Sequence, residues 1–419
     1  MSVQDDDKQI PLHLASLFGW VEMVRILLHR GVTANSMVNL GRTPLHHVAG
    51  SKYCSRPNDV CIAQLLLEHG AGVNAQDNDN TTPLHMASLY GRVDMVKVLL
   101  DHGATSSLPG NLGRTPLHLV ASGVCGFGYN GGRITELLLE HGAGVNTQDK
   151  ENVTPLHLAS YLGRVEISQV LLKHGANANT KCKLGRTPLH LVAEGKHENG
   201  VRITDLLLEH GADVNAQDNG NTTPLYFAAY CRKAEIVRVL LDRGATANLE
   251  TDLGRTPMHA LVQRPHGCGN DGVKIARLLL EHGTNINAQD KHNITPLHFA
   301  SYRGNVGIAP FLLSHGANVS AKDDLGRTPL HAVSQGVYIS QEDGVRIARL
   351  LLEHGADLNG QDNNNETPVD LASHHGKLEI AALLLHYNDE DDAKVDQGLS
   401  SNQPQLEVAN RHEKPALRA

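Results

Sequence analysis

The stretch TPLHMASLYGRVDMVKVLLDHGA, residues 82–104, decides the fold of this 419-residue chain. Thr82 can cap a helix, and Pro83 suits the first helical position, where no amide donor is needed. Gly91 separates this short helix from a second one, whose apolar residues recur at helical spacing. Gly103 then supplies a left-handed end cap. The sequence therefore predicts two short helices joined by a turn.

Variants of this block recur along the whole chain, 33 or 39 residues apart except for one step of 36. The eleven blocks begin at Ile10, Thr43, Thr82, Thr115, Thr154, Thr187, Thr223, Thr256, Thr295, Thr328 and Thr367. A period of this length indicates a stack of small units, each of which buries its apolar face only against its neighbours. We therefore expect an all-α repeat solenoid.

Helix, turn, helix and hairpin, with TPLH opening the unit and LLxxGA closing it, resemble the ankyrin repeat over about residues 4–388. The resemblance implies L-shaped units whose first helices line a concave face. The second helices would form the convex back, and β-hairpins would project as fingers. On this basis we expect an ankyrin-like array at residues 1–388, with an atypical first repeat and a C-terminal cap as the last. An acidic, disordered tail is expected at 389–419.

The repeats alternate in two ways. Five residues into each block, odd repeats carry Ala and even repeats carry Val or Leu, which predicts interdigitated packing of neighbouring layers. Even repeats also carry extra residues between their two helices, at 50–59, 122–132, 194–200, 263–272 and 335–344. These insertions are either tolerated surface loops or recognition loops, and the sequence leaves both open.

Composition excludes several function classes. A net charge of −8 without a Lys/Arg cluster argues against nucleic-acid binding. No apolar run approaches 18 residues, so we expect no membrane span. Six scattered Cys fit a reducing cytoplasm or nucleus and lack the ligand spacing of a zinc site. Motifs of nucleotide-binding loops, hydrolases and zinc proteases are absent, so we expect that the protein is no enzyme and holds no cofactor. We also expect it to be a monomer.

Two recurring polar residues have structural and functional interpretations. In the ankyrin resemblance, the TPLH histidine is a hydrogen-bonding brace between hairpins. An arginine precedes each even block, at Arg42, Arg114, Arg186, Arg255 and Arg327. We expect these arginines to pair with finger carboxylates, and a role in binding an acidic partner is the alternative.

Ankyrin-like arrays bind partners through positions seven and eight residues into the block, together with the fingertips. In odd repeats these positions are mostly bulky, whereas in even repeats they are mostly small or polar. The candidate protein-binding residues are Leu17, Phe18, Leu89, Tyr90, Tyr161, Leu162, Tyr230, Cys231, Tyr302, Arg303, His374 and His375. Aromatic side chains offer large contact area at a small entropic cost. The alternative is that these side chains only cover the neighbouring repeat.

Two functional hypotheses follow. The first is a scaffold that binds a partner protein or peptide in its concave groove. The second is the sensing or substrate-recruiting arm of a larger NTPase-type receptor or ubiquitin-ligase adaptor, which the abrupt start of the array at Met1 motivates. The resemblance also implies that hairpin asparagines are candidate hydroxylation sites. These are Asn74, Asn146, Asn215, Asn287 and Asn359.

Overall fold

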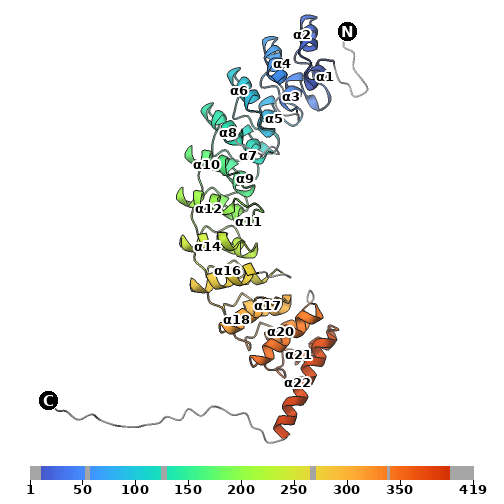
Figure 1. The fold of residues 1–419 in the computed structure, drawn as a ribbon, viewed down its shortest axis with the longest axis vertical. Coiled ribbons are helices and arrows are strands. Elements are labelled where there is room, and N and C mark those ends of the chain that lie inside the picture. The colour runs from blue at the N-terminus through green and yellow to red at the C-terminus, as the bar shows by residue number, and fades with distance from the viewer. Residues whose placement is uncertain (1–10, 52–56, 124–129, 265–269, 337–339, 397–419) are drawn as a thin grey trace, which may run out of the picture.

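The computed structural model describes residues 11–51, 57–123, 130–264, 270–336 and 340–396, and these residues form a bowed stack of helical pairs (Figure 1). This part of the chain contains 22 α-helices, two short 3-10 helices and no β-strand. The predicted all-α repeat solenoid is confirmed.

Each repeat contributes two antiparallel helices. The first helices are α1 (Pro11–Phe18), α3 (Pro44–Ala49), α5 (Pro83–Leu89), α7 (Pro116–Ser122), α9 (Pro155–Tyr161), α11 (Pro188–Glu194), α13 (Pro224–Tyr230), α15 (Pro257–Val262), α17 (Pro296–Arg303), α19 (Pro329–Gln335) and α21 (Pro368–His374). The second helices are α2 (Val21–His29), α4 (Pro57–Glu68), α6 (Val93–Asp101), α8 (Asn130–Glu140), α10 (Val165–Lys173), α12 (Gly200–Glu209), α14 (Ala234–Asp242), α16 (Asn270–Glu281), α18 (Ala309–Ser314), α20 (Gln341–Glu353) and α22 (Leu378–Asp396). The 3-10 helices are η1 (Asn39–Gly41) and η2 (Asn111–Gly113).

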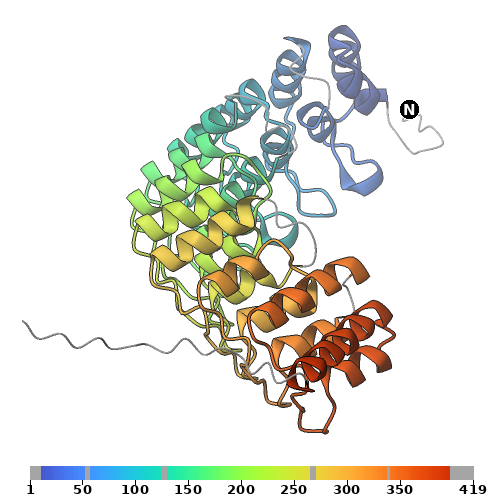
Figure 2. The ribbon, with the colours of Figure 1, turned by 60° about the horizontal axis from the view of Figure 1, so that its bottom comes forward.

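The two helices of a repeat lie on opposite sides of the bend. The second helices α6 to α14 follow the outer, convex edge, and the first helices lie inside it (Figure 1). Figure 2 shows the same curvature, with the second helices of the middle repeats side by side. The first helices therefore line the concave face, as the ankyrin resemblance implied.

Buried side chains explain why the stack forms. The alternating Ala and Val or Leu positions are all buried, as at Ala87, Val120 and Ala159, which are 0%, 6% and 0% exposed. A small residue on one helix accepts a larger one from the next layer, which keeps the narrow core free of voids. Each layer is therefore stabilised mainly by its two neighbours.

The TPLH histidine links each repeat to the following finger. His85 Nδ1 accepts a hydrogen bond from the Thr82 amide at 3.2 Å. The neutral ring then carries its proton on Nε2, which lies 3.1 Å from the Arg114 carbonyl oxygen and donates to it. Equivalent contacts form at His46, His118, His157, His190, His259, His298 and His331. The predicted hydrogen-bonding brace is confirmed.

The fingers differ from the expected β-hairpins. The Asp77 amide donates to the Thr81 carbonyl at 3.0 Å, and the Asn78 amide donates to the Leu40 carbonyl at 2.9 Å. The Asn80 amide also donates to the Asp77 carbonyl at 2.9 Å. Two backbone bonds between residues 77 and 81 and one to the neighbouring finger are too few for a strand ladder, so the described fingers are linked turns. Asn80 closes its turn at φ 57°, the left-handed conformation that its residue type predicted.

The last helix crosses the predicted domain boundary. α22 runs to Asp396, so residue 388 does not coincide with a helix end. Residues 389–396 are mostly acidic, and they continue the helix beyond the last repeat although four of the eight are aspartate, a weak helix former. Residues 397–419 lie outside the described part of the chain, and the disorder of the tail stays a prediction.

The hairpin asparagines form a second set of links between repeats. Asn146 Nδ2 donates to the Gly175 carbonyl at 3.1 Å, and Asn146 Oδ1 accepts from the Asn177 amide at 2.8 Å. Asn74, Asn215 and Asn287 make the same pair of bonds one repeat further on. Ser107 and Ser320 occupy the corresponding position elsewhere. This set of asparagines is therefore interrupted twice.

We expect Asn146→Ala to destabilise the array by about 1 kcal/mol, because it removes two solvent-exposed hydrogen bonds between neighbouring repeats. Urea denaturation monitored by circular dichroism measures the change. Ser107→Ala is the matched control, since no asparagine bridge exists there, and it should cost clearly less. Equal losses would show that the asparagine bridge contributes nothing.

Candidate protein-binding surface

The predicted binding residues lie at the ends of the first helices in odd repeats. Phe18 and Tyr161 are each 45% exposed, and His374 and His375 are also exposed. The remaining candidates are half-buried: Leu17, Leu89, Tyr90, Leu162, Tyr230, Cys231, Tyr302 and Arg303. They follow the array at two-repeat intervals and do not converge on a single site. Such a distribution suits a long groove more than a compact pocket.

Leu17 and Tyr90 come together at the N-terminal end of the groove. They line a pocket of about 270 Å³ with Met86 and His47, among others. Burial, together with the neighbouring His13, lowers the pKa of His47 to about 4. The His47 ring is therefore neutral at pH 7, and the walls are largely uncharged apart from the Arg42 guanidinium.

Tyr302 belongs to a second pocket, of about 210 Å³, between α17 and α19. Phe299 and Tyr302 line it together with Ala332 and Arg327, among others. Three of the other even repeats carry His47, Leu119 and Leu191 at the position of Ala332, and the fourth carries Ala260. The pocket beside the two aromatic rings is a place where an apolar side chain of a partner can bind.

The five arginines of the even repeats pair locally, as expected. Arg42, Arg114, Arg255 and Arg327 each lie 3.0–3.3 Å from a finger aspartate of the next repeat. Arg186 lies 3.6 Å from Asp218 and 2.9 Å from Glu194. The aspartates are nearly buried, between 0% and 9% exposed. These arginines therefore fix the fingers, and their charge is already neutralised.

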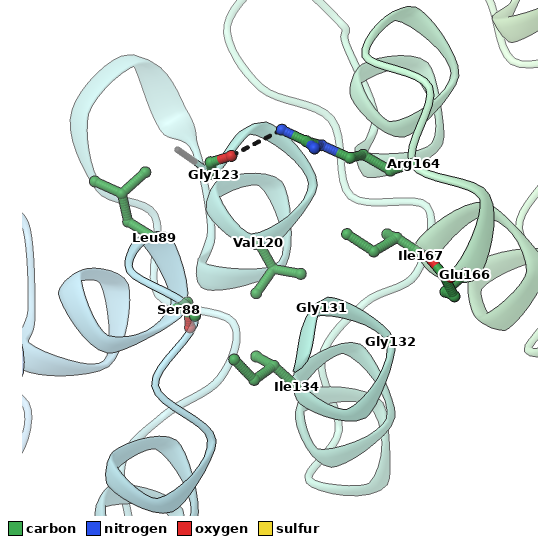
Figure 3. Close-up of a pocket in the computed structure, with 11 residues that line it drawn as sticks. Ser88, Leu89, Val120, Gly123, Gly131, Gly132, Ile134, Arg164, Glu166 and Ile167 are labelled. Atoms are coloured by element: carbon green, nitrogen blue, oxygen red, sulfur yellow. Dashed lines mark hydrogen bonds between the residues drawn. The ribbon is translucent and has the colours of Figure 1, made fainter. Parts of the chain in front are cut away.

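The insertions of repeats 4 and 6 are tied to a neighbouring repeat where the structure describes them. His197 Nε2 lies 3.0 Å from the Ser160 carbonyl oxygen, and Asn199 Nδ2 donates to the Gly163 carbonyl at 3.0 Å. Arg164 of repeat 5 donates to the Gly123 carbonyl in the insertion of repeat 4, so that insertion is tied to the following repeat (Figure 3). In repeat 6, whose insertion is fully described, the loop is packed against its neighbour, while parts of the other insertions lie outside the described residues.

A small cavity lies beside these tethers, lined by Leu89, Val120, Ile134 and Ile167 among others (Figure 3). Its volume is about 30 Å³, which is enough for about one water molecule. It is therefore no ligand pocket. Because Leu89 lines this cavity between repeats, at least part of its surface serves packing within the array.

Comparison with known proteins agrees with this architecture. The family model "Ankyrin repeats (3 copies)" matches residues 51–127, 125–218, 198–290, 244–323, 266–341 and 321–396, and the model "Ankyrin repeat" matches 7–39. The chain belongs to the ankyrin-repeat family. Ankyrin repeats are a protein–protein interaction module, and the family is generally non-catalytic.

Individual relatives are similar over short stretches. The probable 26S proteasome regulatory subunit p28 of Saccharomyces cerevisiae is 33% identical over 95 residues, which are 22% of this chain and 39% of that protein. The mouse B-cell lymphoma 3 protein homolog is 35% identical over 98 residues, covering 23% of this chain and 20% of that protein. Human ankyrin repeat and SOCS box protein 16 is 41% identical over 81 residues, 19% of this chain and 17% of that protein. This chain thus matches less than half the length of each.

The ankyrin fingertips carry an exposed feature that the sequence patterns did not assign. The leucines at the tips of the even repeats are between 48% and 60% exposed, and they are Leu40, Leu112, Leu184, Leu253 and Leu325. Each was visible in the sequence as the leucine before the finger glycine. Their backbone carbonyls accept hydrogen bonds from the next finger, while their side chains are exposed to solvent.

The described part of the array contains no cluster of three or more His, Cys, Asp or Glu that could hold a metal ion. Cys54, Cys125 and Cys268 lie outside it. Among the described helices, none is both long and apolar enough to cross a membrane.

Proposed function

We propose that this ankyrin array binds an extended segment of a protein partner along its concave face. The main support is an alternation along that face. The first helices of odd repeats mostly end in large side chains, whereas those of even repeats mostly end in small or polar ones. The two pockets beside Tyr90 and Tyr302 supply sites for anchoring side chains near opposite ends of the groove. An extended partner can reach both pockets, whereas a small ligand reaches only one.

The proposed role is non-catalytic, and we place the protein in the cytoplasm or nucleus as a monomer that binds neither nucleic acid nor membrane. The buried histidines support a structural role, because in His157 and His190 both ring nitrogens lie within hydrogen-bonding distance of protein atoms. A histidine held in this way cannot exchange protons with a substrate without breaking the repeat interface.

A second candidate is that the array recruits a client for a larger assembly. The similarity to a protein named as a proteasome regulatory subunit, and to one named for a SOCS box, favours it. Size-exclusion chromatography of native extract tests this candidate. Co-elution with a complex much larger than the 45.3 kDa chain supports it, and elution as a free chain or a one-to-one complex contradicts it.

The groove is tested by combining Tyr90→Ser, Tyr161→Ser, Tyr230→Ser and Tyr302→Ser in one variant. We expect partners captured from native extract to fall by about tenfold or more, because buried aromatic anchors carry much of the binding energy of an interface. Quantitative mass spectrometry after affinity capture measures the loss.

The matched control replaces the same four tyrosines by phenylalanine, which keeps the rings and removes only the hydroxyl groups. It should retain most of the partner, and both variants must melt like the wild type. Equal capture by the serine variant and the wild type would exclude the concave groove as the binding surface.

A further inference from the structure

The pocket between α17 and α19 has an equivalent position two repeats earlier, between α13 and α15. Most of its lining residues recur there: Phe299, Tyr302, Arg327, Ala332 and Gln335 correspond to Phe227, Tyr230, Arg255, Ala260 and Gln263. Among the helix residues that line the pocket, one differs. His298 stands where the earlier repeat has Tyr226, the array's only tyrosine at the TPLH position.

Tyr226 shows which side chain this arrangement accommodates. Its half-buried ring extends from α13, and its hydroxyl lies 3.3 Å from Gln263 Nε2, which donates to it. The tyrosine and the glutamine therefore connect the first helices of repeats 7 and 8 across the groove side of the array.

The phenylalanines beside the two positions are held in the same way. The Phe227 ring meets the edge of His190 at 5.9 Å between centres, and Phe299 meets His259 at 6.1 Å. The arginine of the preceding even repeat lies over each phenylalanine ring. The two positions are therefore equivalent in side-chain geometry as well as in sequence.

In repeats 9 and 10 the histidine does not replace the phenol. His298 Nε2 lies 3.0 Å from the Arg327 carbonyl oxygen, as part of the brace to the next finger. His298 and Gln335 both line the pocket of about 210 Å³. Within the described part of the chain, the Gln335 side-chain amide has no hydrogen-bonding partner.

We propose that this pocket binds a tyrosine side chain of the protein partner in the concave groove, with the tyrosine hydroxyl hydrogen-bonded to Gln335. This inference rests on the proposed function and names the anchoring side chain. The tyrosine ring packs against Phe299 and Tyr302, as aromatic pairs do in interfaces. The pocket is smaller than the range of about 300–1,000 Å³ for sites of drug-sized ligands, so it suits a single side chain.

The charges around the pocket favour tyrosine over phosphotyrosine. Arg327 Nε lies 3.0 Å from Asp362 Oδ2, so its charge is neutralised. The Asp323 carboxylate also lines the pocket, where the earlier repeat has Thr251. A phosphate group would be repelled by this carboxylate.

Nuclear magnetic resonance of the full chain with ¹³C-labelled alanine methyl groups tests the proposal, with N-acetyl-tyrosinamide as the probe. We expect the Ala332 methyl signal to shift with a dissociation constant on the order of 1 mM. N-acetyl-phenylalaninamide should bind about fivefold more weakly, because it lacks the hydroxyl group. Gln335→Leu should weaken the tyrosine probe about fivefold and leave the phenylalanine probe unchanged.

A gain of binding provides a second test. Tyr226→His restores the TPLH histidine in repeat 7 and should open the equivalent site, so that the Ala260 methyl signal shifts with the tyrosine probe. Tyr226→Phe is the matched control, since it keeps the ring in place, and its Ala260 signal should stay as unresponsive as that of the wild type.

An Ala332 signal that does not move at about 10 mM probe would overturn the proposal. Equal binding of the phenylalanine probe, or tighter binding of N-acetyl-phosphotyrosinamide, would also overturn it. So would an Ala260 signal that responds alike in the wild type and in Tyr226→His. If the probe fails to bind while the serine variant of the four tyrosines loses its captured partners, the groove remains and only the tyrosine anchor is excluded. If the probe binds and the serine variant keeps its partners, the proposed function fails instead.

Discussion

Lowering the pH from 7.5 to 4 is expected to destabilise the ankyrin array severely. Burial lowers the pKa of the TPLH histidines, and for His85, His157, His190 and His259 it lowers the pKa to about 4. In the unfolded chain histidine titrates near its ordinary value of 6.5. Below about pH 6.5 the histidines of the unfolded state therefore bind protons, whereas the buried histidines of the folded state stay neutral. Stability is lost as the pH falls from about 6.5 to 4.

The hydrogen bonds of the histidines also predict a loss of stability at low pH. In each brace, Nδ1 accepts from a backbone amide, as it does from Thr154 at 3.1 Å in His157. Protonation would turn that acceptor into a donor facing another donor. A shift of this size corresponds to about 3 kcal/mol per histidine at pH 4. Because several braces titrate together, we expect the melting temperature to fall by more than about 10 °C.

Thermal melts by circular dichroism at half-unit steps between pH 4 and 7.5 measure this loss. His157→Gln should be less stable at pH 7.5. Its melting temperature should also depend less steeply on pH, because one histidine with a lowered pKa has been removed. His174→Gln, an exposed position in the same repeat, should follow the wild-type curve. A flat melting temperature across this range would contradict the buried, neutral histidines.

Much of this architecture could be predicted because the same helix-capping and turn residues recur in nearly every repeat. Threonine capping, the proline that follows it and the glycine end caps are local properties, and the sequence placed them correctly. The pairing of the even-repeat arginines with finger aspartates also follows from position alone. Each partner lies in the next repeat at a fixed separation, as Arg255 and Asp290 do.

Other features arise at positions that differ from the repeat consensus or from contacts between repeats. The repeat pattern alone does not predict them. Arg232, after α13, was visible as a missing glycine, but its hydrogen bond to the Arg264 carbonyl depends on the packing of two repeats. The exposure of the fingertip leucines follows from the direction in which each finger points. The sequence predicted a turn at the glycine that ends the first helix, as at Gly91, but it predicted no role for the next residue, which is Arg92 or Arg164. In the structure both arginines reach back to the preceding repeat.

Asp59→Ala is expected to destabilise the N-terminal repeats by about 3–5 kcal/mol, because it leaves a buried guanidinium without its partner. Arg92 Nη2 lies 2.6 Å from Asp59 Oδ2, and the two side chains are 5% and 0% exposed. Arg92 Nη1 also donates to the Val48 carbonyl at 2.5 Å. Urea denaturation measures the loss. Asp59→Leu combined with Arg92→Met should recover most of it, since a buried ion pair is often replaceable by apolar residues of similar volume.

The effect should also be local, because a solenoid is stabilised by contacts between nearest neighbours. Asp59 and Arg92 join repeats 2 and 3, so Asp59→Ala weakens that interface and leaves later ones unchanged. We therefore expect faster amide hydrogen exchange in α1 to α6, with α9 to α16 protected as in the wild type. Glu22→Ala is the matched control, because its pairing with Arg25 is exposed to solvent and should contribute little. Uniformly faster exchange along the whole array would mean that the repeats unfold as one cooperative unit, and the local stabilisation argued from the buried pair would be wrong.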